Sequence, residues 1–109
     1  MQIDFGNVLN TLKTGIVNLA QTTLKDYVAQ ATQDGQAILN ELKDNLKTWT
    51  QALADGSLSK ADFGDLVLGQ KDLLEMVALK QAGLAVIQVD QFKMDVINLI
   101  KTTITGLIP

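Results

Sequence analysis

Apolar residues recur every eleven positions along both halves of the chain, and this spacing constrains the fold more than any other feature of the sequence. In the first half one such row consists of Phe5, Ile16, Tyr27, Ile38 and Trp49. In the second half a similar row consists of Phe63, Leu74, Ala85, Val96 and Leu107. Eleven residues make three turns at about 3.67 residues per turn, so each row stays on one face of an α-helix. The spacing therefore predicts long amphipathic helices in both halves.

The stretch Leu-Ala-Asp-Gly-Ser-Leu-Ser-Lys-Ala-Asp-Phe, residues 53–63, carries the signals of one helix end followed by a helix start. Gly56 suits the left-handed conformation that often follows a helix C-terminus. Ser59 suits an N-cap, and Asp62 three residues later forms a variant of the capping box. Asp4 is placed in the same way to cap a helix near the start of the chain. The sequence therefore predicts a turn at the centre of the chain.

Two interior glycines decide between two architectures. If Gly35 and Gly83 each formed a turn, the chain would fold as a single-chain four-helix bundle. The eleven-residue spacing of the rows continues unchanged across both glycines. A loop at either glycine would have no reason to preserve this spacing. The phase therefore favours an all-α fold built as a long antiparallel two-helix hairpin. Its helices would cover about 5–54 and 60–105, joined by a turn at about 55–59.

The apolar arc of the second predicted helix is wider than one neighbouring helix can cover. Beside the main row lie four further apolar residues, Leu73, Met76, Leu84 and Ile87. Left exposed in a hairpin, they would form a larger apolar patch than soluble monomers usually carry. We therefore predict a single helical domain, residues 1–109, that forms a homodimer through these four residues and completes a four-helix bundle.

Small residues would also face one another near the middle of the predicted hairpin, with Ala31 and Gly35 opposite Ala78 and Ala85. Small side chains at such a place allow either close helix–helix contact or a small apolar cavity. The general frequency of such sites favours close contact, and the sequence leaves the cavity open as an alternative.

The residue types that most often carry catalysis and metal binding are missing. The chain has no histidine and no cysteine, and its nine basic residues are all lysine. It therefore lacks the commonest general base, thiol nucleophile and transition-metal ligands. Without arginine, and with a net charge of −3, it is poorly suited to nucleic acid. We expect no catalytic residue, no cofactor and no metal, and a non-enzymatic module for helical self-association or protein interaction.

The most apolar stretch, residues 83–108, is interrupted by Asp90, Lys93 and Asp95. A bilayer-spanning helix needs about 20 mostly apolar residues, so we expect no membrane span and no membrane partner. The absence of a signal peptide and of disulfides predicts a cytoplasmic protein, with leaderless secretion left open.

An alternative function is a secreted or membrane-surface-active helical hairpin effector. The chain is similar in size and in its central turn to the small secreted hairpins of the W-x-G family. Trp49, however, is followed by Thr-Gln-Ala-Leu-Ala-Asp-Gly, so the motif that defines that family is absent.

Overall fold

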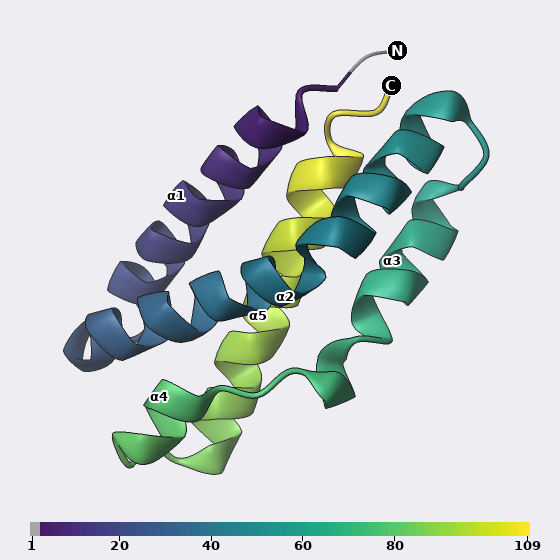
Figure 1. Ribbon diagram of the computed structural model, residues 1–109. Helices are drawn as coiled ribbons and strands as arrows, with labels where there is room; N and C mark the ends of the chain where they lie inside the picture. Colours follow the sequence, from purple (N-terminus) through teal and green to yellow (C-terminus); the bar gives the residue numbers. More distant parts are fainter. Residues whose placement is uncertain (1–2) are drawn as a thin grey trace.

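The computed structural model describes residues 3–109, and every regular element in that range is helical (Figure 1). The α-helices are α1 (Phe5–Thr23), α2 (Val28–Asp55), α3 (Lys60–Leu68), α4 (Val77–Gln81) and α5 (Val86–Thr105). Two short 3-10 helices, η1 (Lys25–Tyr27) and η2 (Lys71–Leu73), lie in the connections. The predicted all-α class is confirmed.

The helices pack as a compact bundle in which α1 and α2 form an antiparallel hairpin (Figure 1). Helix α5 packs against α1 and α2, α3 packs against α5, and α4 packs against α2. The longest dimension of the molecule is 43 Å. Two helices of about 70 Å would not fit in this shape. The predicted long two-helix hairpin is therefore wrong, and the chain instead folds back on itself three times.

The first predicted helix, about 5–54, is interrupted at residues 24–27. Leu24 leaves the helical region, with φ −132° and ψ 62°, and η1 then turns the chain into α2. The turn brings the apolar face of α1 onto that of α2, and one unbroken helix would leave both faces to water. Neither glycine nor proline marks this turn, so the sequence carries no strong local signal for it.

The two interior glycines behave differently from each other. Gly35 lies inside α2, as the eleven-residue phase predicted. Gly83 has φ 88° and lies in the turn that separates α4 from α5, so its predicted place inside a helix is wrong. The structure therefore follows the four-helix alternative at Gly83 but not at Gly35.

The second predicted helix, about 60–105, is also broken between α3 and α4. Leu74 is extended, with φ −97° and ψ 133°. This path buries both Leu74 and Met76, which stand on different faces of a regular helix. Met76, which a dimer partner was expected to cover, is thus buried in the core of the single chain.

The central turn is confirmed. Gly56 follows α2 with φ 80°, the left-handed conformation expected of it. The side chain of Ser59 accepts a hydrogen bond of 3.1 Å from the backbone N–H of Asp62 and caps α3. Asp4 caps α1 in the same way through the backbone N–H of Asn7.

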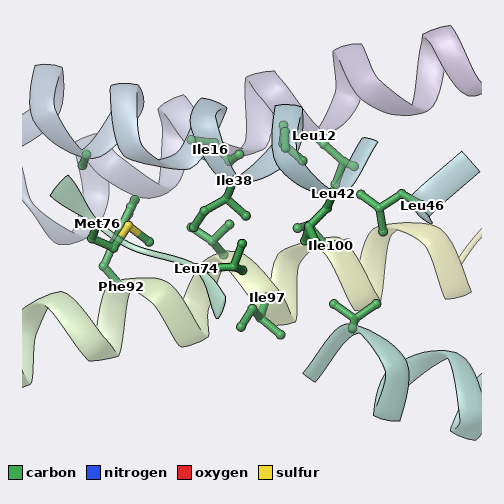
Figure 2. Packing of buried hydrophobic residues seen from close by; sticks show 14 of the residues in the cluster. Leu12, Ile16, Ile38, Leu42, Leu46, Leu74, Met76, Phe92, Ile97 and Ile100 are labelled. Carbon is green, nitrogen blue, oxygen red and sulfur yellow. The ribbon is translucent and has the colours of Figure 1, made fainter. Parts of the chain in front are cut away.

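The core runs along the interface of α1, α2 and α5 and extends under the segment between α3 and α4 (Figure 2). Figure 2 labels Leu12, Ile16, Ile38, Leu42, Leu46, Leu74, Met76, Phe92, Ile97 and Ile100. Each such side chain contributes about 1.5–3 kcal/mol on leaving water. The row residues Ile16, Ile38 and Val96 are buried, whereas Tyr27 and Trp49 are only half-buried.

Candidate functional site

Four large apolar side chains are exposed on η2, α4 and the first turn of α5. The exposed fractions are 69% for Leu73, 48% for Val77, 68% for Val86 and 79% for Ile87. Helix α4 and the start of α5 lie at the end of the molecule away from both termini, and η2 packs beside α5 (Figure 1). We refer to these four residues as the apolar end surface; Leu73, on η2, lies beside residues 90–94 of α5. The four are the most exposed large apolar side chains among residues 3–109.

The structure divides the four residues of the predicted dimer interface. Leu73 and Ile87 belong to the apolar end surface. Met76 is fully buried and Leu84 is buried, both in the core of the single chain, and Figure 2 shows Met76 beside Phe92. The expectation that a lone chain would leave all four uncovered is therefore wrong for Met76 and Leu84. The interface itself stays a prediction.

Val77 and Val86 were not among the residues of the predicted interface. In the structure α4 begins at Val77, and Ala85, in an extended conformation, precedes α5. Helical spacing could have found Val77, which lies one turn from Leu73, whereas Val86 falls on another side of a continuous helix.

A buried carboxylate joins α2 to α4. Both oxygens of Asp34 accept hydrogen bonds, one of 2.9 Å from the backbone N–H of Ala78 and one of 2.8 Å from that of Leu79. Asp34 is only 3% exposed. Met76, at the N-cap position of α4, makes no side-chain cap hydrogen bond. Asp34 therefore caps a helix that lies more than forty residues away in sequence.

The hydrogen bonds of Asp34 have a structural role, because they hold α4 against α2. The two Asp34 oxygens are already engaged by peptide groups, which satisfies a charge that would be costly to bury alone. A helix of five residues is too short to be stable without such support. Sequence reasoning missed Asp34 because an acid in the middle of a helix gives no local sign of a distant partner.

Two of the open grooves on the surface lie near helix ends. One, of about 280 Å³, lies between the ends of α1 and α5 and is lined mainly by Ile3, Val8 and Leu107. The other, of about 380 Å³, lies beside η1 and the Gly83 turn and has a mostly polar lining. Asp4 in the first groove already serves as the cap of α1. Neither groove adds a second feature that points to a ligand.

Residues 3–109 contain no group of three or more acidic side chains placed to hold a metal ion. Within the same range no helix is long and apolar enough to cross a membrane. The chain is thus a small all-α protein, and its most distinctive surface feature is the apolar end surface. Comparisons with protein-family models, with curated proteins and with solved structures find no match.

Proposed function

We propose that the protein is a non-enzymatic helical interaction module that self-associates through the apolar end surface. The exposure of Leu73, Val77, Val86 and Ile87 on neighbouring elements carries this proposal. Removing apolar surface from water yields about 25 cal/mol per Å², so covering four such side chains favours association. The predicted homodimer is retained, with Val77 and Val86 in place of Met76 and Leu84.

The charges around this surface favour a second copy of the chain as the partner. Lys71, Asp72, Asp90 and Lys93 border a groove where η2 meets α5, and the Lys93 ammonium donates a 3.0 Å hydrogen bond to the carbonyl of Lys71. In a two-fold symmetric dimer the same surface of both copies meets, so a lysine of one copy can approach an aspartate of the other. A rim with both signs of charge is therefore self-complementary.

The chemistry of the chain supports a binding role rather than catalysis. Histidine and cysteine are absent from the sequence. The most deeply buried acid, Asp34, has both oxygens engaged by backbone N–H groups. We therefore propose no catalytic residue and no cofactor for this protein.

Light scattering across a range of protein concentrations tests the proposal. We expect the native protein to reach at least twice the 11.8 kDa chain mass at micromolar concentration. Ile87→Asp should shift it toward monomer, because the variant places an unpaired charge in the buried interface. Leu107→Asp is the matched control, since Leu107 is an exposed apolar residue near the C-terminus, away from the apolar end surface.

A native protein that stays monomeric at these concentrations would overturn self-association. Vesicle flotation then tests the alternative function. If the monomeric native protein floats with the vesicles and Ile87→Asp abolishes this flotation, the result would favour a membrane-surface-active effector. Equal loss of association in both variants would show that the apolar end surface is not the interface.

A further inference from the structure

Between Gly69 and Gly83 the residues have a local preference for a helix, yet only α4 of this stretch is α-helical in the fold. The segment contains no proline and a single β-branched residue, Val77, among many Leu, Ala, Lys, Gln, Glu and Met residues. These are the best helix-forming types. The structure nevertheless uses only the short elements η2 and α4 here. Such a conflict between local preference and fold means that tertiary contacts impose the break before α4, whereas Gly83 favours the break after it locally.

Four of the exposed apolar residues would form an ordered stripe if the breaks were removed, whereas Leu68 and Val86 would lie on another side of the helix. In one helix over residues 60–105, Leu66, Leu73, Val77 and Ile87 would fall within about 80° of one another, at about 100° per residue. In the compact fold all four are exposed. The main apolar row, which includes Phe63, would keep its own face of the same helix. The segment therefore carries the pattern of a second, continuous conformation.

The hydrogen bonds of Asp34 and a continuous helix exclude each other. In the compact fold the N–H groups of Ala78 and Leu79 donate to the Asp34 carboxylate. In a continuous helix the same two groups would donate to the carbonyls four residues earlier, those of Leu74 and Glu75. Asp34 is thus the polar contact that selects the broken conformation, alongside the burial of Leu74 in the core.

We propose that residues 69–85 are a switch between two folds of this protein. In the compact fold Asp34 holds the segment against α2. In the other fold α3, α4 and α5 join into one helix, and its C-terminal part packs on the α1–α2 hairpin of a second copy. This inference rests on the proposed self-association and adds to it a second contact, that of α5 with the α1–α2 hairpin of the other copy.

The geometry identifies a second copy as the partner of the joined helix. A continuous helix over residues 60–105 would be about 69 Å long, whereas the compact molecule measures 43 Å in its longest direction. The helix cannot stay on its own α1–α2 hairpin along its whole length. The surface complementary to a displaced α5 is the one that another copy exposes when its own α5 leaves.

Gly83→Ala tests the switch with little steric interference. Gly83 has φ 88°, and a Cβ atom there would meet nothing within 4 Å. Alanine would therefore strain the turn of the compact fold and favour the continuous helix, and the dimer Kd should fall at least about tenfold. Gly56→Ala is the matched control. Gly56 has φ 80° and equally open space, but its turn is present in both folds.

Asp34→Asn tests the hydrogen bonds that hold α4 against α2 in the compact fold. The variant weakens the two charge-assisted hydrogen bonds to α4 without changing the size of the side chain. We expect it to lower the dimer Kd in the same direction as Gly83→Ala. Asp44→Asn is the control, because Asp44 is an exposed aspartate of the same helix and undergoes the same change of charge.

Spin labels on a pair of introduced cysteines report the conformation, since the chain has none of its own. Suitable exposed positions are Asp65 on α3 and Thr102 on α5. These helices pack together in the compact fold, so the distance between the labels is short. In the joined helix the two positions would lie about 56 Å apart. Labelled chains are diluted with unlabelled protein so that only distances within one chain are measured.

A dimer with the long distance, enriched by Gly83→Ala and Asp34→Asn, supports the switch. A native dimer that keeps the short distance overturns it and leaves the proposed self-association intact. A native protein that is monomeric, with variants that stay monomeric at the short distance, overturns both proposals.

Discussion

At the scale of single residues, two positions inside α2 decide how neighbouring elements approach it. Asp34 reaches α4 through two backbone N–H groups. Gly35, the next residue, allows α1 to come close, because a Cβ atom at this position would overlap the side chain of Ile16. The small residue thus serves close contact with α1, whereas the sequence placed Ala78 and Ala85 opposite it.

Gly35→Ala should destabilise the protein by about 1–3 kcal/mol, because the new methyl group overpacks the contact with Ile16. This loss should exceed the gain of about 1 kcal/mol from better helix propensity. Urea denaturation followed by circular dichroism measures the difference.

Gly64→Ala is the control for this substitution. Gly64 is also a buried helical glycine, but the atoms that a new Cβ would meet belong to the flexible end of Lys101. That side chain can move aside, so the variant should be neutral or more stable by up to about 1 kcal/mol. Equal effects at Gly35 and Gly64 would contradict the close contact between α1 and α2.

At the scale of elements, the ends of the helices have unequal support. The N-termini of α1 and α3 are capped by a side chain at the preceding residue, whereas α4 depends on Asp34 from another helix. The turn at Leu24 is set by packing, because its backbone conformation is favoured only once α1 and α2 bury their facing rows. Local chemistry therefore determines some boundaries, and tertiary contact determines the others.

Ser59→Ala should cost about 1 kcal/mol of unfolding free energy, because it removes the hydrogen bond that caps α3. Ser57→Ala is the control, since the hydroxyl of Ser57 makes only an exposed 3.3 Å hydrogen bond to the carbonyl of Ala52. That variant should stay within about 0.5 kcal/mol of the native protein. Denaturant unfolding of both variants checks the cap, and a smaller loss at Ser59 than at Ser57 would count against it.

At the scale of the whole molecule, the compact fold separates apolar residues that the sequence places in one group. Met76 and Ile87 both extend the apolar arc of the second half, yet Met76 is fully buried and Ile87 is the most exposed large apolar residue of the described chain. The two residues should therefore respond differently to truncation.

Met76→Ala should cost about 2–5 kcal/mol of stability, because it leaves a cavity in the core of the single chain. Ile87→Ala should change stability by no more than about 0.5 kcal/mol and should weaken self-association instead. Thermal unfolding at low protein concentration, together with sedimentation velocity, separates these effects. A large stability loss in Ile87→Ala at concentrations where the protein is monomeric would contradict the exposed position of Ile87.

The sequence by itself determined the helical class, the central turn and both N-caps, because helix periodicity, a left-handed glycine and an N-cap serine act over a few residues. It also showed that the second half is too apolar for one neighbouring helix. Only the tertiary structure decided that the helices break at Leu24 and at Leu74, and which of the two candidate glycines, Gly35 and Gly83, forms a turn. It also decided that Asp34 caps α4, and which apolar residues remain outside. These outcomes depend on contacts between segments far apart in the chain, where burial outweighs local helix preference, and no periodicity along the sequence records that balance.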